Sequence, residues 1–200
     1  IVLTWTDDPA TSQAVTWRTA ARVDSAVAEL TVATPHGGFG RIEGMQDSAV
    51  TVLATTQKLS TDLGEASYHS VEFKGLLPET LYAYRVGDGA NWSEWFQFRT
   101  ASRQRKPFSF IYFGDAQREV KSQWSRVIRQ AYKHASDARF VIHAGDLIDR
   151  HNRDAQWGEW FNAGGWLNGM LPSIPAVGNH EYGSDAVSYT HLTLPTKDSV

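Results

Sequence analysis

The chain has 200 residues, of which 42% are hydrophobic and 20% charged, and its formal net charge is -3 at pH 7. This is the composition of an ordinary globular protein with one or two domains. The sequence has no Lys/Arg-rich run of the kind that binds nucleic acid, no apolar stretch near the ~20 residues of a membrane span, and no cysteine for a disulfide or thiolate metal site.

Residues 1–101 have the pattern of β-structure throughout. Short runs rich in Val, Thr and aromatic residues alternate with turn residues such as those of Asp7–Pro9 and Gly87–Gly89. About seven short strands with no helical stretch between them predict a β-sandwich. The predicted strands are Ile1–Trp5, Ala14–Arg18, Ala26–Ala33, Ala49–Ala54, Tyr68–Lys74, Leu81–Val86 and Trp95–Arg99.

The stretch Leu77–Val86 resembles the segment that enters the sixth strand of fibronectin type III domains, with its Leu-x-Pro-x-Thr-x-Tyr pattern. A Tyr in this place can hydrogen-bond its hydroxyl to the backbone of the preceding corner. The alternative is a strand that starts after a proline and carries an amphipathic Tyr. We expect residues 1–101 to form a fibronectin type III-like sandwich.

The polar, basic stretch Ala101–Pro107 predicts a linker, after which the hydrophobic period changes. Phe108–Phe113 is a continuous apolar run, typical of a strand buried on both faces. Arg139–His143 and Ile174–Val177 are predicted as two further strands. Helical patterns lie between these strands, so we expect an α/β domain over residues 107–186 with right-handed crossovers and a mainly parallel sheet.

Each of the two predicted helices begins with a capping residue and has one apolar face. Ser122 is expected to cap the first helix and Asp154 the second. The tryptophans of the second helix are expected in the core, with the lining of a substrate cleft as the alternative. The two apolar faces are Trp124, Val127, Ile128, Ala131, Tyr132 and Ala135, and then Trp157, Trp160 and Phe161.

Each predicted strand of the α/β domain ends in a glycine followed by a potential metal ligand. The motifs are Gly114-Asp115, Gly145-Asp146 and Gly178-Asn179-His180-Glu181. Because the carboxyl ends of parallel strands share one edge of a sheet, we expect these ligands to converge there. Each glycine is expected to let the backbone turn sharply where its strand stops.

The ligand types are suited to two hard cations. Asp115 can bind one ion, Asp146 can bridge two with its two oxygens, and Asn179 offers a neutral amide oxygen. Two ions about 3.5–4 Å apart can clamp a phosphate and generate hydroxide from bound water. His180 is better placed to contact phosphate or protonate the leaving oxygen than to bind metal. Glu181 is expected to accept a bond from a neighbouring imidazole.

Three further residues near the second motif are candidates for a role. Arg150 and His151 could reach a substrate phosphate, with a solvated loop as an equal alternative. His143 is expected to be a core histidine with a hydrogen-bond partner rather than a metal ligand.

In this order the three motifs resemble the first three of five sequence blocks of the calcineurin-like metallophosphoesterases. With the sandwich and the opening Ile1–Pro9, the chain resembles the purple acid phosphatases from residue 1 to about 186. The resemblance implies that residues 107–186 are an incomplete α/β metallophosphoesterase sandwich domain. It implies hydrolysis of small-molecule phosphate monoesters at a binuclear centre of ferric iron with iron, zinc or manganese. Three histidine ligands would then lie in later blocks.

The chain departs from this resemblance at two positions of the first metal site. The purple enzymes carry a Tyr three residues after the bridging Asp, where this chain has Asp149. The wider superfamily has a His two residues after the first Asp, where this chain has Gln117. Asp149 or Gln117 could substitute as an oxygen donor, and oxygen-rich ligation favours manganese, magnesium or zinc over purple ferric iron.

The two ends of the chain carry expectations of their own. The chain starts at Ile1 directly in a strand-like run, so we expect the start of the gene product, with any signal peptide, to precede it. The resemblance implies a secreted, periplasmic or cell-surface protein. Residues 187–200 leave the family pattern and resemble translated sequencing-adapter DNA. We expect a non-native tail, with a divergent loop as the alternative.

Three functions remain open from the sequence. The first is phosphate monoester hydrolysis by a metal-activated hydroxide. The second is a phosphodiesterase or nucleotidase of the same superfamily. The third is a binding module in which the sandwich acts beside an inactive hydrolase domain. Fold alone does not separate them, so the site must decide.

Overall fold

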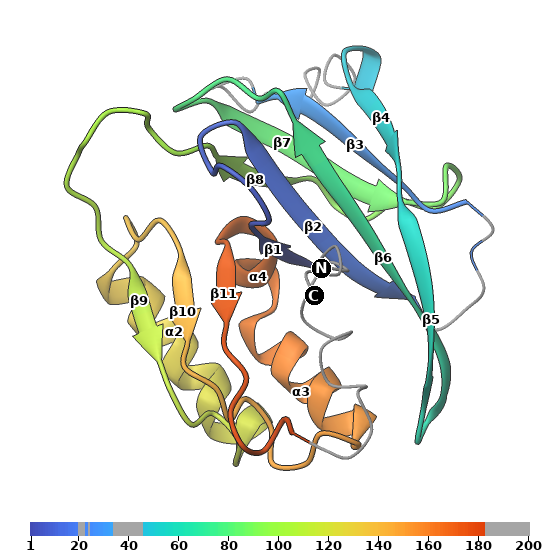
Figure 1. The fold of residues 1–200 in the computed structure, drawn as a ribbon, viewed down its shortest axis with the longest axis vertical. Helices are drawn as coiled ribbons and strands as arrows, with labels where there is room; N and C mark the ends of the chain where they lie inside the picture. Colours follow the sequence, from blue (N-terminus) through green and yellow to red (C-terminus); the bar gives the residue numbers. More distant parts are fainter. Residues whose placement is uncertain (20–22, 24, 34–45, 183–200) are drawn as a thin grey trace, which may run out of the picture.

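The computed structural model describes residues 1–19, 23, 25–33 and 46–182 (Figure 1). An all-β domain is followed, after a linker, by an α/β domain, as predicted. None of the helices in these ranges has the length and apolar character needed to cross a membrane. The predicted tail, residues 187–200, lies outside the described residues.

The first domain is a sandwich of two four-stranded antiparallel sheets, with strand orders β1-β2-β6-β5 and β4-β3-β7-β8. All seven predicted strands are present, and β5 is an additional one. Its sequence is polar and it lies mostly exposed at a sheet edge, so it lacks the apolar alternation that marks a strand. The strands are β1 (Val2–Thr4), β2 (Ser12–Thr19), β3 (Val27–Val32), β4 (Val50–Leu53), β5 (Thr55–Thr61), β6 (Gly64–Lys74), β7 (Leu81–Gly87) and β8 (Phe96–Arg99).

The inner faces of the two sheets meet in an aromatic core. Tyr84 and Phe98 are almost fully buried, and Phe73 contacts both rings. Tyr82, two positions before Tyr84 on β7, accepts a hydrogen bond at its hydroxyl from the Leu77 N–H, at 2.9 Å. This bond back to the preceding corner confirms the predicted role of a Tyr in the Leu77–Val86 stretch.

The second domain contains a three-stranded parallel sheet of order β11-β10-β9, which confirms the predicted parallel pairing. The strands are β9 (Ile111–Phe113), β10 (Val141–His143) and β11 (Ser173–Pro175), each shorter than predicted. The register aligns Phe113, His143 and Pro175, so the three strands end level with one another.

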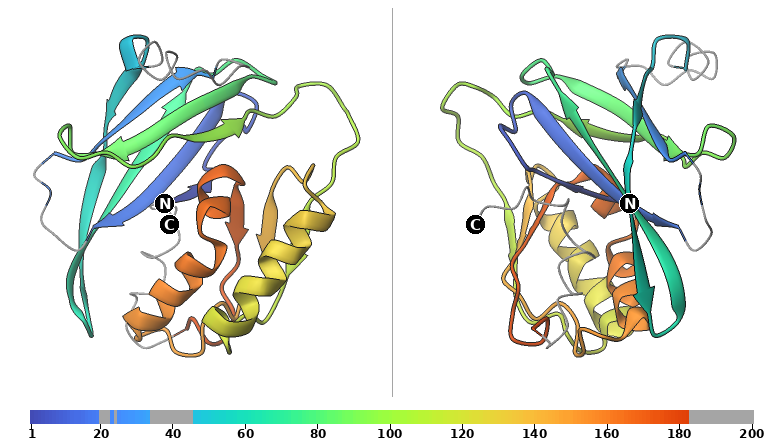
Figure 2. Two further views of the ribbon diagram at one scale, coloured as in Figure 1. Left: turned by 180° about the vertical axis from the view of Figure 1, so that it is seen from behind. Right: turned by 45° about the vertical axis from the view of Figure 1, so that its right-hand side comes forward.

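The helices lie on one face of this sheet (Figures 1 and 2). On that face Ile111 and Val141 are buried. On the opposite face Tyr112 and Ile174, in register with Ile142 between them, are 65% and 39% exposed, and Phe110 is 46% exposed. Within the described residues, the prediction that the first strand is buried on both faces is therefore wrong.

The helical segments are a π-helical turn η1 (Val120–Trp124), α2 (Ser125–His134), α3 (Asp154–Gly164) and α4 (Trp166–Met170). Neither predicted capping residue caps its helix. The Ser122 hydroxyl lies inside η1 and donates to the Glu119 carboxylate at 2.5 Å. Asp154 is the first residue of α3, and its carboxylate bonds to the sandwich instead.

The apolar faces of the helices are largely as predicted. Trp124, Trp157 and Trp160 are buried in one cluster, so these tryptophans pack in the core. Val127 is the exception, because it is 48% exposed on the outer side of α2.

The two domains are in direct contact through α4, which packs against β1 and β8. The buried Tyr84 hydroxyl donates to the Gly169 carbonyl at 2.7 Å. A Cβ atom on Gly169 would lie 2.8 Å from the Phe96 ring, so only glycine allows this approach. The sandwich and the α/β domain therefore share a closely packed interface.

Candidate metal and active site

The three predicted motifs follow the level ends of the parallel strands, so they lie at one edge of the sheet. Asp115 and Asp146 both adopt a left-handed backbone, with φ of 53° and 50°. A non-glycine residue in this region costs roughly 1–3 kcal/mol, and such strain is concentrated at functional sites. The two carboxylates are therefore held at matching, strained positions after adjacent strands.

Of the three motif glycines, only Gly145 has the positive φ of the expected sharp turn. Gly145 has φ of 92°, and a Cβ atom there would lie 2.7 Å from Gly178. A Cβ atom on Gly178 would lie 2.2 Å from Asp146 Oδ1, so this glycine permits close approach of the second and third motifs. Gly114 does not adopt a left-handed φ, because the turn falls on Asp115, and a Cβ atom on Gly114 would make only an ordinary contact of 3.9 Å with Ala144. The expectation of a sharp turn at Gly114 is wrong.

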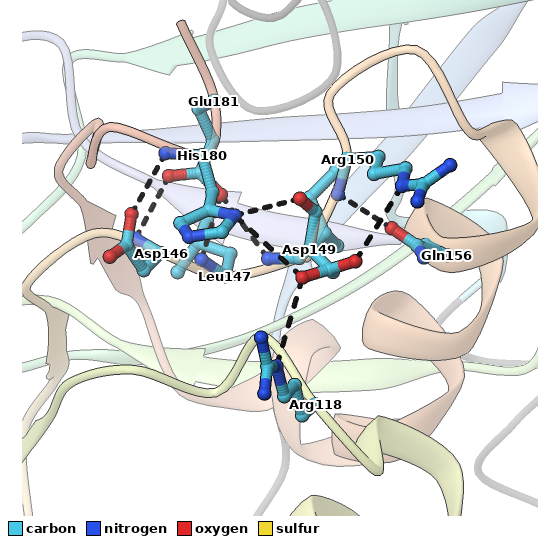
Figure 3. A network of polar contacts seen from close by, with 9 residues as sticks. Arg118, Asp146, Leu147, Asp149, Arg150, Gln156, His180 and Glu181 are labelled. Atoms are coloured by element: carbon cyan, nitrogen blue, oxygen red, sulfur yellow. Dashed lines mark hydrogen bonds and ion pairs between the residues drawn. The ribbon is translucent and has the colours of Figure 1, made fainter.

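Glu181 joins the third motif to the second (Figure 3). Its side chain is 1% exposed, and its two oxygens accept four backbone N–H bonds of 2.8–3.2 Å. The donors are Asp146, Leu147, Ile148 and Gly178. The bonds observed at this carboxylate are thus to backbone and not, as expected, to an imidazole. Charge-assisted bonds of this kind are stronger than neutral ones, so Glu181 fixes the path of the Asp146 loop.

His180 is oriented by two contacts with the second motif. Its backbone N–H donates to Asp146 Oδ1 at 3.0 Å, and its Nδ1 lies 2.7 Å from the Asp149 carbonyl oxygen. A carbonyl oxygen can only accept, so Nδ1 carries a proton. The side chain is 29% exposed, which leaves Nε2 as the nitrogen available to a substrate.

Asp149 lies among basic side chains (Figure 3). Its carboxylate oxygens are 3.8 Å from Arg118 Nε, Arg150 Nε and His180 Nδ1. Arg118 was not predicted as a site residue, and nothing in its sequence context, an irregular loop after β9, could have indicated it. The role of Asp149 as a metal ligand stays a prediction.

The other candidate residues differ in how firmly they are held. Arg150 is exposed, and its backbone N–H donates to Gln156 Oε1 at 2.8 Å. The His151 carbonyl accepts from Trp157 Nε1 at 3.0 Å, which fixes its backbone. Asp115 and Asn179 are exposed at the sheet edge.

The donors present match part of a metal site. The side-chain oxygen of Gln117 is buried without a hydrogen-bond partner, two residues after Asp115. An unpaired buried oxygen is costly unless a further partner satisfies it, and hard cations prefer such oxygen donors. Within the described ranges, however, no group of three or more His, Asp or Glu side chains could hold a metal ion. These residues therefore supply only part of a coordination shell.

His143 is a core residue, but not in the way expected. It is 1% exposed, and neither ring nitrogen has a hydrogen-bond partner. Its ring contacts Phe113, Trp124 and Trp160, at centroid distances of 5.8, 6.2 and 5.1 Å. Burial lowers the pKa of His143 to about 4, so the ring is neutral near pH 7.

A cleft of about 520 Å³ lies at the opposite edge of the sheet from the motifs. It is bordered by the linker, by Trp5 of the sandwich, and by Phe108, Arg139 and Phe140, which precede β9 and β10. It therefore has no part in the candidate site.

Comparison with known proteins gives a consistent family assignment for both domains. Residues 1–100 match the model of the purple acid phosphatase N-terminal domain, and residues 108–198 match that of the calcineurin-like phosphoesterases. "Acid phosphatase type 7" of Danio rerio is 30% identical over 125 residues, covering 60% of this chain and 28% of the relative. An uncharacterized protein of Mycobacterium tuberculosis is 24% identical over 212 residues, covering 94% of this chain and 38% of the relative.

Two solved structures share the fold. A purple acid phosphatase from yellow lupin (Lupinus luteus) seeds superposes with a TM-score of 0.70 at 18% identity, over 90% of this chain and 35% of the other. PhoD superposes with a TM-score of 0.57 at 18% identity, over 94% of this chain and 42% of the other. The chain thus spans less than half the length of each of these relatives.

Proposed function

Since the chain belongs to the purple acid phosphatase family, in which a calcineurin-like phosphoesterase domain follows the N-terminal domain, we propose that it hydrolyses phosphate monoesters with two metal ions. The observation that carries the proposal is the Glu181 carboxylate, which accepts bonds from the Asp146 loop and from Gly178. A buried charge with four bonds to two motifs holds them in one fixed arrangement, which catalysis by positioning requires.

In this proposal Asp115, Asp146 and Asn179 hold the metal ions, and Gln117 or Asp149 completes the oxygen donors. The metal ions would supply Lewis-acid chemistry and lower the pKa of bound water. Oxygen donors in place of the family's Tyr and His favour manganese, zinc or magnesium over ferric iron. The strained backbone at Asp115 and Asp146 supports this assignment, because it sets both carboxylates before any ion arrives.

His180 would give a proton to the leaving oxygen. Its Nδ1–H is bound to the Asp149 carbonyl, which fixes the ring plane and leaves Nε2 for the substrate. The Asp149 carboxylate also lies 3.8 Å from Nδ1, on the side of the ring away from Nε2. Arg150, exposed beside Asp149, would bind a phosphate oxygen, and the Asp149 carboxylate restrains its guanidinium.

The decisive experiment is Asp146→Asn in the full-length gene product. Loss of one carboxylate oxygen should empty both metal positions, because the bridge is shared, and p-nitrophenyl phosphate turnover should fall by at least about 10²-fold. Metal content by mass spectrometry and turnover are measured together. The matched control is Asp137→Asn, an exposed carboxylate bonded to Ser109 on the surface.

Three outcomes would contradict the proposal. Loss of metal at one position with the other filled would exclude a bridging role for Asp146. Faster turnover of bis(p-nitrophenyl) phosphate than of p-nitrophenyl phosphate would make the protein a phosphodiesterase. Wild-type protein that binds no metal and turns over neither compound would be a binding module with an inactive hydrolase domain. A secreted, periplasmic or cell-surface location is part of the same proposal.

A further inference from the structure

The start of α3 is bound by the sandwich domain through a buried carboxylate. The Asp154 side chain is 2% exposed, and its Oδ2 lies 2.5 Å from Arg18 Nη2 on β2. Thr61 Oγ1, at the end of β5, donates to the same oxygen at 3.1 Å. Asp154 is thus paired with residues more than ninety positions away in the sequence.

A second contact holds the backbone of the same residue. The turn between β5 and β6 extends beside α3 (Figure 2), and Asp62 in this turn accepts the Asp154 N–H at 2.9 Å. The other oxygen of Asp62 lies 3.5 Å from Arg153 Nη1. Both the side chain and the backbone of Asp154 are therefore bound by the first domain.

The first turn of α3 in turn holds the loop that carries the second motif. Gln156 Oε1 accepts the Arg150 N–H, and the fully buried Trp157 donates from Nε1 to the His151 carbonyl. The Glu181 carboxylate holds the other end of this loop at Asp146. The loop between Asp146 and Asp154 is thus fixed at one end by Glu181 and at the other by the sandwich.

Simple adhesion of the two domains does not account for this arrangement. The interface already has the packing of α4 on β1 and β8 and the bond from Tyr84 to Gly169. A buried carboxylate adds little to adhesion, because its desolvation offsets the attraction of its partner. Asp154 Oδ1 moreover is buried without a hydrogen-bond partner. The Arg18–Asp154 pair instead fixes the position of the first residue of α3 relative to the sandwich.

We propose that Arg18, Asp62 and Asp154 form a latch through which the sandwich positions the Asp146–Asp154 loop of the candidate active site. Arg18, Asp62 and Asp154 are positioning residues. Through them the sandwich domain determines the geometry of the candidate active site. The kinetic consequence rests on the proposed hydrolase function, but the positioning itself does not.

The first test measures amide hydrogen exchange in the full-length gene product, with Arg18→Met and Asp62→Ala. Arg18 is partly exposed and Asp62 lies in an exposed turn, so both variants should fold. Opening of the latch should speed exchange at the Arg150 and Arg153 amides by about tenfold, with Val141 in β10 unchanged. Arg18→Lys should restore slow exchange. Arg85→Met, which removes the ion pair with Glu29 inside the sandwich, is the matched control.

The proposal is overturned if exchange at Arg150 stays at the wild-type rate, or if Arg150 and Val141 speed up equally, since the latch would then only add stability. The second test uses the full-length product. Arg18→Met should lower kcat about tenfold with KM and metal content unchanged, because a small misplacement of catalytic groups acts on kcat. An unchanged kcat in an active enzyme would also overturn the proposal. Loosened exchange in a protein without any turnover would refute the hydrolase function and leave the latch standing.

Discussion

At the scale of single residues, the second motif differs most from the family pattern at Asp149. Its carbonyl fixes the His180 ring, and its carboxylate lies between Arg118 and Arg150. A Tyr at this position could not pair with the two guanidinium groups in the same way. Asp149 therefore places a carboxylate rather than a phenol among the basic side chains of the candidate site.

The first prediction at this scale concerns colour. If Asp149 takes the place of the tyrosinate, the iron-loaded full-length protein should show no visible charge-transfer band of a ferric phenolate. Asp149→Tyr should create one, and Asp137→Tyr, on the surface, should not. Absorption spectra of the three proteins check this. A purple wild type would mean that another Tyr, such as the exposed Tyr182, reaches the metal.

The second prediction concerns acid stability. His143 has a pKa of about 4 in the folded protein and about 6.5 when unfolded, so below pH 6.5 the unfolded chain binds a proton that the folded chain does not. The free energy of unfolding should therefore fall as the pH drops from 6.5 towards 4, by roughly 3 kcal/mol in total at about 1.4 kcal/mol per pH unit.

Urea denaturation of His143→Phe and of wild type at pH 7.5 and pH 4.5 tests this. An apolar ring among Phe113, Trp124 and Trp160 cannot bind the proton, so the variant should lose about 2–3 kcal/mol less than wild type between the two pH values. His134→Gln, an exposed position on α2, is the control and should behave as wild type. Equal losses in wild type and in His143→Phe would show that other groups cause the acid sensitivity.

At the scale of elements, the described part of the chain covers one face of the sheet β11-β10-β9 with helices and leaves the other face exposed (Figure 1). The helices bury Ile111 and Val141, whereas Phe110, Tyr112 and Ile174 lie exposed on the other side. Phe110 stacks on Phe140, and Phe108 contacts both rings at a tilt. A contiguous exposed apolar surface of this kind favours self-association.

We expect the 200-residue chain to bind an apolar fluorescent dye and to form oligomers at micromolar concentration. The double variant Phe110→Thr and Tyr112→Thr should reduce both, because it removes the two central rings from the open face. Val50→Thr, an exposed valine on β4, is the control. Dye fluorescence and size-exclusion chromatography are the measurements, and an unchanged elution volume of the double variant would locate self-association elsewhere.

At the scale of the whole molecule, the two domains differ in how complete their cores are. The sandwich encloses Leu3, Val15, Tyr84 and Phe98 between its own two sheets. In the α/β domain the buried cluster lies between the helices and one face of the sheet. Its described residues supply only part of a metal coordination shell. The first domain therefore has an enclosed core of its own, whereas the described part of the second leaves one sheet face exposed.

The corresponding prediction is that residues 1–101 alone fold as a stable, cooperative sandwich. Residues 1–200 should bind metal weakly and show no turnover of p-nitrophenyl phosphate with added manganese, zinc or iron. Circular dichroism melting checks the first part and the phosphatase assay the second. Turnover that disappears in Asp146→Asn would show that the three motifs are sufficient. A non-cooperative melt of residues 1–101 would show that the sandwich depends on α4.

The sequence alone determined both domains and the edge of the sheet that carries the candidate chemistry. Short runs rich in Val, Thr and aromatic residues, separated by turn residues, predicted the sandwich. The alternation of strands and helices predicted the parallel sheet. Both patterns can be recognised because they are local in the sequence. The strand-end motifs could be placed on one edge for the same reason, since parallel strands share their carboxyl ends.

Only the tertiary structure decided the partners of individual polar groups. The bonds of Glu181 to the Asp146 loop, the contacts of Asp149 with Arg118 and His180, and the pairing of Asp154 with Arg18 join residues 31 to 136 positions apart. Such pairings depend on how packed elements meet, and no local pattern encodes them. Asp154 has the sequence of a helix cap and Ser122 does too, but each hydrogen-bonds elsewhere because a competing partner lies within reach. Local sequence patterns therefore determined the strands and helices, whereas the packing of these elements determined the hydrogen bonds and ion pairs of the candidate site.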